Sequence, residues 1–191
     1  MALDGHSSSS SLPFVISGAG SIRGVSNVVS EFGLKAPLFI TSASYTLHPA
    51  LKKILRRVDK ASLIFGVTSA IDEPYTAQNT LLISELFSKG GFDSLVVFGG
   101  SNLCNFASRF VYDYAQLSQD KTNTHHDSVG SSNFIPYILI PTELHNTLQY
   151  NNSNSNGITM HEIPKVMTPS VNGLKPIPLS VIIDERIISA S

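Results

Sequence analysis

The stretch "SLVVFGGSNLCNFASRF", residues 94–110, decides the fold. It opens with a continuous apolar run, stops at Gly99, Gly100 and Ser101, and continues with apolar residues at helical spacing. A continuous run of Leu, Val and Phe is typical of a strand that is covered on both faces. A strand that passes through glycines into a helix is the start of a βα unit. The stretch therefore predicts a parallel sheet.

The rest of the chain repeats this alternation. Further candidate strands, rich in Val, Ile, Leu and Phe, are residues 13–17, 36–41, 62–67, 137–140 and 180–184. Apolar residues recur at helical spacing within residues 22–32, 47–58 and 103–114, and a less regular helix is expected at 76–88. The order predicts an α/β domain with a Rossmann-like, mainly parallel sheet and helices on both faces.

The expected boundaries follow from the same pattern. We assign the α/β domain to residues 13–186, with a disordered lead-in at 1–12 and a tail at 187–191. Two polar segments, 116–133 and the asparagine-serine tract 150–157, lack apolar periodicity and predict loops.

Composition limits the kinds of partner. The charged share is 14%, against about 25% in an average soluble domain, so an apolar face that joins a homo- or hetero-oligomer is one expectation. The net charge of −1 argues against binding of nucleic acid or of an anionic membrane. Only "KKILRR", residues 52–57, is locally basic, and a solvated helix face is its simpler interpretation.

The single cysteine, Cys104, excludes an internal disulfide and fits a reducing compartment. No apolar run reaches the 18 or so residues of a membrane span, and residues 1–14 lack the features of a secretory signal. We therefore expect a cytoplasmic protein. Cys104 lies near a helix start, where a thiolate nucleophile is favoured, although a structural cysteine is the simpler interpretation.

The glycine turn (Gly99, Gly100 and Ser101) has two interpretations. It is either a cap of the following helix through Ser101 or Asn102, or a phosphate-binding turn that combines close backbone approach with a helix N-terminus. Other strands also end in glycine, serine or threonine, in "FVISGAGSIRGV" (14–25), "FITSAS" (39–44) and "ILIPTELHNT" (138–147). Such turns on one sheet edge favour a cleft that binds a dinucleotide.

The order of motifs resembles the N-terminal half of the iron-containing alcohol dehydrogenase family, which includes glycerol dehydrogenases and maleylacetate reductases. The similar motifs are "SGAGSI" (17–22), "KAPLFIT" (35–41), "HPALKKIL" (48–55), "DSLVVFGGS" (93–101), "PYILIPTEL" (136–144) and "PLSVIID" (178–184). They extend over nearly all of residues 13–186. The "PTEL" motif is similar to the maleylacetate reductase-like branch, whose turn begins Pro-Thr-Thr-Leu.

The resemblance implies NADP or NAD as cofactor and hydride transfer between an alcohol and a carbonyl. The implied cofactor-binding residues are Gly99, Gly100, Ser101 and Asn102 at the pyrophosphate, Ser42 at the adenosine ribose, Thr142 and Leu144 beside the nicotinamide and adenine, and Lys165. The family often has an aspartate where this chain has Ser42. Because a carboxylate there would repel a 2′-phosphate, Ser42 removes a preference for NAD over NADP.

Several positions depart from the family pattern. Phe98 replaces the first of three glycines, and Cys104 replaces an aspartate in the following helix. The chain also lacks the family's C-terminal helical domain, which supplies one aspartate and three histidines to a metal. No two of its six histidines have i,i+4 helical spacing, so we expect no metal site within the chain. Glu143 and His145 are candidate acids or bases, with a loop surface as the simpler interpretation.

Two functional hypotheses follow. The first is a truncated, divergent oxidoreductase domain that binds or once bound NAD(P)(H) and needs a metal-binding half for catalysis. The second is a non-catalytic pseudoenzyme or repurposed protein that acts as a nucleotide-binding or partner-binding subunit. A fragment of a longer gene product is a third possibility.

Overall fold

The structure, a computed structural model, describes residues 13–71, 76–122, 134–143 and 176–188. These residues form a six-stranded sheet in the order β1-β6-β5-β4-β2-β3, and every neighbouring pair of strands is parallel. The strands are β1 (Phe14–Ser17), β2 (Pro37–Ser42), β3 (Gly66–Ile71), β4 (Ser94–Gly99), β5 (Tyr137–Pro141) and β6 (Ser180–Ile183). The predicted Rossmann-like α/β fold is confirmed.

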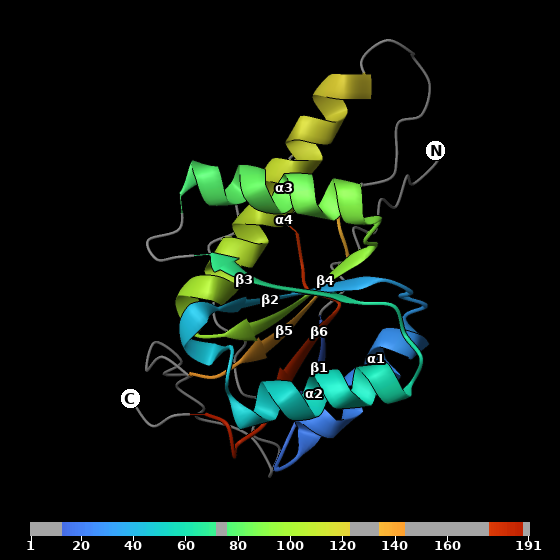
Figure 1. The fold of residues 1–191 in the computed structure, drawn as a ribbon, viewed down its shortest axis with the longest axis vertical. Helices are drawn as coiled ribbons and strands as arrows, with labels where there is room; N and C mark the ends of the chain where they lie inside the picture. Colours follow the sequence, from blue (N-terminus) through green and yellow to red (C-terminus); the bar gives the residue numbers. More distant parts are fainter. Residues whose placement is uncertain (1–12, 72–75, 123–133, 144–175, 189–191) are drawn as a thin grey trace, which may run out of the picture.

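Helices cover both faces of the sheet (Figure 1). On one face lie α1 (Val25–Glu31), which follows the short helix η1 (Ser21–Gly24), and α2 (Pro49–Lys60), which follows η2 (Ala43–Tyr45). On the other face lie α3 (Ala77–Gly90) and α4 (Ser101–Thr122). None of the helices in the described ranges is long and apolar enough to cross a membrane.

The continuous apolar run of β4 is explained by burial on both faces. Leu95 and Val97 pack into the hydrophobic cluster formed with α3 and α4. Val96 and Phe98 pack into the cluster formed with α1 and α2. Successive side chains of a strand point to opposite faces of the sheet. A strand between two helical layers therefore buries all of them, and neither of its faces is polar.

The third strand begins later than the sequence predicted. Residues 62–67 were the expected strand, but β3 begins at Gly66, which pairs with Leu38. The residues before it end helix α2: Ser62 adopts a left-handed φ of 56°, and Leu63 N donates to Val58 O at 3.3 Å. The apolar run at residues 62–67 therefore contains both the residues that end helix α2 and the first residues of strand β3.

Two helix boundaries also differ from the prediction. The helical spacing within residues 47–58 begins at Leu47, but α2 begins at Pro49 and Leu47 is 75% exposed. Helix α4 continues to Thr122, into the predicted loop 116–133. Its last turns contain glutamine, leucine and lysine, which have good helix propensity and need no apolar periodicity. The predicted lead-in 1–12 and the tract 150–157 lie outside the described residues.

Candidate functional site

The strand order reverses between β2 and β4. From β2 the chain moves outward to β3 and then returns, through α3, to β4 on the other side of β2. Thr41 pairs with Phe98 across these strands, and Thr41 Oγ1 donates to Phe98 O at 2.9 Å. Ligands of open parallel sheets bind outside the carboxyl ends of the strands at such a point. The candidate site is therefore the edge where β2 and β4 end.

The glycine turn connects β4 to α4 at this edge. Gly99 ends the strand, Ser101 begins the helix, and Thr142 N from the end of β5 donates to Gly99 O at 3.0 Å. A Cβ on Gly99 would lie 2.7 Å from Leu103 Cδ2, so a larger residue there would displace the Leu103 side chain. The first N–H groups of a helix lack intrahelical acceptors and attract anions. The start of α4 is thus suited to a phosphate.

A carboxylate of the chain itself lies at this turn. A Cβ on Gly100 would lie 2.7 Å from Glu143 Oε2, so the Glu143 side chain occupies the space beside the glycine. Tyr45 Oη donates to Glu143 Oε1 at 2.7 Å, which joins the loop after β2 to the end of β5. A carboxylate near a helix N-terminus is electrostatically favoured. The turn therefore fits an anion, but Glu143 already supplies one.

Most of the predicted site residues meet at this edge. Ser42, the glycine turn and Thr142 lie at the ends of the adjacent strands β2, β4 and β5. Ser42 Oγ shares a hydrogen bond of 2.8 Å with Ser44 Oγ, and Asn102 is exposed in the first turn of α4. The predicted residues Leu144 and Lys165, and the candidate base His145, lie outside the described residues.

In the described part of the chain, Thr142 has the one buried side-chain oxygen without a hydrogen-bond partner. Its side chain is 1% exposed, and Oγ1 has no hydrogen-bond partner among the described residues. A buried hydroxyl without a partner costs about 1–3 kcal/mol, so a ligand atom that bonded it would gain affinity. Within the same residues, no group of three or more His, Cys, Asp or Glu side chains could hold a metal ion.

The second glycine-rich turn, Gly18 to Gly20, takes no part in this site. It follows β1, which is separated from β4 by β6 and β5. Gly20, with φ of 91°, donates its N–H to Asp184 Oδ1 at 2.9 Å, and Ile22 N donates to Asp184 Oδ2 at 3.4 Å. The turn was expected to help form the cleft, but the N–H groups of Gly20 and Ile22 are bonded to a buried carboxylate of the chain.

The two substitutions inside the glycine turn motif are core residues. The Phe98 ring is fully buried. Its centroid lies 6.1 Å from the centroid of the Tyr45 ring and 5.4 Å from that of the His48 ring. Cys104 is 1% exposed, and burial, with a smaller contribution from the charge of Glu143, raises the pKa of its thiol to about 12. These facts support the structural interpretation of Cys104.

Solved structures share the fold. An iron-containing alcohol dehydrogenase from Thermococcus thioreducens has a TM-score of 0.64 and 17% identity, over 92% of this chain and 46% of that one. A sulfoacetaldehyde reductase from Bifidobacterium kashiwanohense, solved in complex with NAD+, has a TM-score of 0.63 and 14% identity, over 92% and 45%. The chain has the fold of half an iron-containing alcohol dehydrogenase.

A maleylacetate reductase from Rhizobium sp. strain MTP-10005 is also similar, with a TM-score of 0.55 and 19% identity, over 91% of this chain and 41% of that one. The chain thus spans less than half the length of these structures. No protein-family model and no curated protein matches it. At these identities the likeness establishes the fold, which is the fold that the motif order predicted.

Within this iron-containing alcohol dehydrogenase fold, the sequence identified Glu143 but missed its partner. Tyr45 follows the "FITSAS" turn and belongs to η2, and nothing in its sequence position marks it as a contact of Glu143, 98 residues away. The one available signal was its place just after a strand that ends at the proposed cleft. The pairing of Tyr45 with Glu143 emerges only when β2, β4 and β5 lie side by side.

Proposed function

We propose that the chain is a dinucleotide-binding, oxidoreductase-like domain that binds NADP or NAD where β2 and β4 end. The observation that carries the proposal is the glycine turn, which opens α4 at the point where the strand order reverses. In this proposal the pyrophosphate faces the N–H groups of Gly100, Ser101 and Asn102 at the start of the helix. The sulfoacetaldehyde reductase with the same fold was solved with NAD+.

The other residues of the site supply recognition. Ser42 places a neutral hydroxyl where the family often has a carboxylate, so a 2′-phosphate meets no negative charge there and NADP is accepted. Thr142 offers a buried hydroxyl without a partner in the described residues. Leu144 and Lys165 remain proposed contacts on the resemblance alone. The cofactor, when bound, supplies a hydride.

Catalysis is proposed to require more than these residues. The resemblance implies that a metal-binding half polarises the alcohol or carbonyl, and this chain spans less than half of the length of its structural neighbours. We therefore propose hydride transfer only for a protein in which such a half completes the site.

A second candidate function is a non-catalytic subunit that binds a nucleotide or a protein partner. The position of Glu143 favours the partner-binding form of this candidate, because a fixed carboxylate beside Gly100 repels the phosphates of any nucleotide. The two candidates differ in whether Glu143 moves aside for a dinucleotide.

Titration with NADPH and NADH, followed by cofactor fluorescence and by thermal unfolding, tests the proposal. We expect binding by the wild-type chain and at least about a tenfold loss of affinity in Gly100→Ala, whose Cβ narrows the turn against Glu143. Gly24→Ala is the matched control, because a Cβ at Gly24 meets nothing within 4 Å. No response at about 1 mM of either cofactor, in the wild type and in Glu143→Gln alike, would exclude the dinucleotide proposal.

A further inference from the structure

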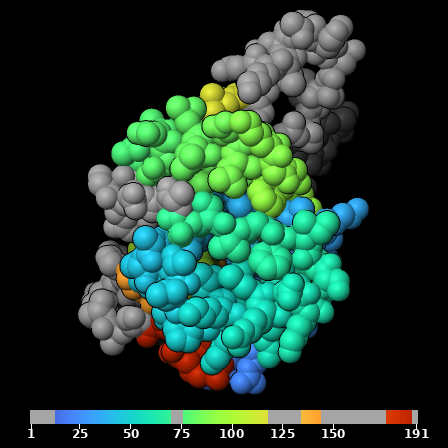
Figure 2. Space-filling view, viewed as in Figure 1, coloured from blue at the N-terminus to red at the C-terminus, as the bar shows by residue number. Residues whose placement is uncertain are grey.

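A second cavity lies away from the glycine turn, between η1, α2 and the segment that follows β6. It has a volume of about 690 Å³, within the range of small-molecule sites. Figure 2 shows the segment after β6, in red, beside the cyan surface at the start of α2. We call this cavity the basic groove. It is lined by Ile22, Arg23, His48, Pro49, Ala50, Lys53, Ile54, Arg56, Arg57, Lys60, Asp184, Arg186 and Ile187.

Positive charge is concentrated here. Six of the chain's 13 lysines and arginines line the groove, although the net charge of the chain is −1. Lys53, Arg57 and Lys60 recur at i, i+4 and i+7 on α2 and so share one helix face. Lys53 and Arg57 belong to the "KKILRR" segment, residues 52–57, whose simpler interpretation from sequence was a solvated face.

Little negative charge opposes these cations. Asp184 is the one carboxylate that lines the groove, and it is fully buried and bonded to Gly20 N, Ile22 N and Arg186. Within the described part of the chain, Arg186 is the only groove cation that forms an ion pair. Gathering several cations without counter-charges raises the free energy of the protein, and an anionic ligand would relieve it.

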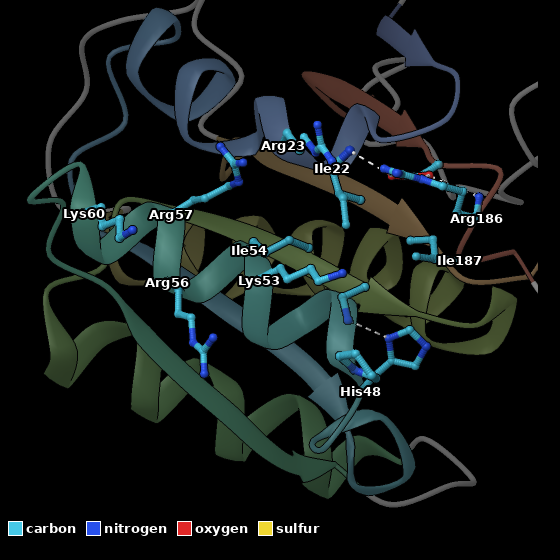
Figure 3. A pocket seen from close by; sticks show the side chains of 13 residues that line it. Ile22, Arg23, His48, Lys53, Ile54, Arg56, Arg57, Lys60, Arg186 and Ile187 are labelled. Carbon is cyan, nitrogen blue, oxygen red and sulfur yellow. Dashed lines mark hydrogen bonds and ion pairs between the residues drawn. The ribbon is translucent and has the colours of Figure 1, made fainter.

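The groove also has an apolar side. Its accessible apolar surface comes from the exposed Pro49 and the half-buried Ile187, with Ile22 and Ile54 buried beneath. Figure 3 shows Lys53 and Arg57 near Ile54, with Arg23 and Arg186 further along the groove and Arg56 pointing to the other side of α2. Cations around an apolar patch are complementary to an organic body that carries anionic groups. An arginine guanidinium can donate two parallel hydrogen bonds to two oxygens of the same phosphate.

We propose that the basic groove binds a small organic molecule that carries two or more phosphate groups. A single phosphate would leave most of the cations unpaired. A nucleic acid is disfavoured because the charge is confined to one cavity and the chain as a whole is weakly acidic. The basic groove is formed by η1, α2 and the segment after β6, whereas the proposed dinucleotide site lies where β2, β4 and β5 end. The two sites share no lining residue.

Calorimetric titration of the full chain with inorganic phosphate, tripolyphosphate and adenosine triphosphate tests the proposal at an ionic strength of about 0.1 M. We expect affinity to rise from phosphate to tripolyphosphate to the nucleotide. The variant Lys53→Glu/Arg57→Glu should weaken tripolyphosphate binding at least about tenfold, because it replaces two cations by anions. Lys52→Glu is the matched control, since Lys52 is exposed on the same helix but does not line the groove.

Several results would overturn the proposal. These are equal losses in Lys52→Glu and in the double variant, unchanged binding in the double variant, or absence of tripolyphosphate binding by the wild type. Loss of binding in Gly100→Ala would place the polyphosphate at the glycine turn instead. Tighter binding of a short single-stranded DNA than of tripolyphosphate would indicate a nucleic-acid site. The surface substitutions are expected to leave the unliganded unfolding temperature nearly unchanged, which a thermal scan checks.

Discussion

At the scale of single residues, Glu143 decides how open the glycine turn is to a phosphate. Replacing Glu143 by Gln removes the charge beside Gly100 and keeps the shape of the side chain. If the turn binds a dinucleotide, we expect affinity for NADPH to rise about tenfold, since a like charge at contact distance costs at least about 1.4 kcal/mol. Fluorescence titration of the two proteins measures this.

The control for that variant is Tyr45→Phe. It deletes the hydrogen bond of 2.7 Å to Glu143 Oε1 but keeps the carboxylate, so affinity should change less than about threefold. Equal NADPH affinities in wild type and Glu143→Gln would mean that the carboxylate does not compete with the cofactor.

Cys104 gives a second test at this scale. With the thiol pKa raised to about 12 by burial and, less strongly, by Glu143, only about one thiol in ten thousand is ionised at pH 8. We expect iodoacetamide to leave the native protein unmodified over an hour and to add one label in urea, as intact-mass spectrometry would show. Rapid labelling of the native protein would restore the interpretation of Cys104 as an activated nucleophile.

The sequence predicted where the glycine turn lies but not what surrounds it. Gly99, Gly100 and Ser101 could be placed between a strand and a helix because an apolar run stops there and helical spacing follows. The occupation of that turn by Glu143 could not be predicted, because it depends on the Tyr45 hydroxyl and on β5 lying next to β4. A sequence pattern predicts local structure such as a turn, but it does not predict which side chain from a distant part of the chain will contact that turn.

At the scale of elements, the end of β4 joins the sheet to the loop after β2. The fully buried Phe98 ring packs against Tyr45 and His48, and His48 caps α2 by accepting from Ala50 N at 3.2 Å. Phe98→Ala should therefore lower the free energy of unfolding by about 3–5 kcal/mol. Phe98→Leu, which keeps most of the volume, should cost less than about 2 kcal/mol. Urea unfolding measures both.

The outcome that contradicts this view is a loss below about 1 kcal/mol in Phe98→Ala, which would mean that the ring adds little to the core. In that case the substitution of a family glycine by Phe98 would need an explanation at the turn itself.

The predicted boundaries of the helices and strands were less accurate than the elements themselves, because a boundary also depends on structure that the pattern does not show. The apolar run at residues 62–67 could not be divided by periodicity into the exit of α2 and the start of β3. The division depends on Ser62, whose φ of 56° is unusual for a residue other than glycine. Elements buried on both faces were easier, because continuous apolar runs such as that of β4 have few alternatives.

At the scale of the whole molecule, two carboxylates tie the sheet together at distant points. Asp184 holds the turn after β1 through Gly20 N and Ile22 N. Asp93 accepts from Lys35 N at 2.7 Å and Ala36 N at 3.1 Å, and so joins the loop before β2 to the start of β4. Each carboxylate thus accepts from two backbone N–H groups of a segment far away in the sequence.

Both carboxylates titrate in the same direction. Burial opposes their ionisation, but the hydrogen bonds that they accept outweigh it and lower each pKa below the usual value. Asp184 accepts from Arg186 and from the N–H groups of Gly20 and Ile22. Asp93 accepts from Lys35 N, Ser94 Oγ and Ala36 N. A group whose pKa is lowered by folding adds stability that is complete above its unfolded pKa of about 4. That stability is lost as the pH falls through the folded pKa.

We therefore expect the urea midpoint of the wild type to be nearly level from pH 7 to about pH 5 and to fall steeply below about pH 4. Asp184→Asn should lower the free energy of unfolding at pH 7 by about 2 kcal/mol, because it weakens several hydrogen bonds to a buried charge. Its acid limb should be shallower, so that the two curves approach each other as the pH falls below the lowered pKa of Asp184. Glu85→Gln, which breaks only the exposed pair with Lys89, should leave the curve almost unchanged. Parallel acid limbs for wild type and Asp184→Asn would show that Asp184 does not couple protonation to folding, and its role would then be steric.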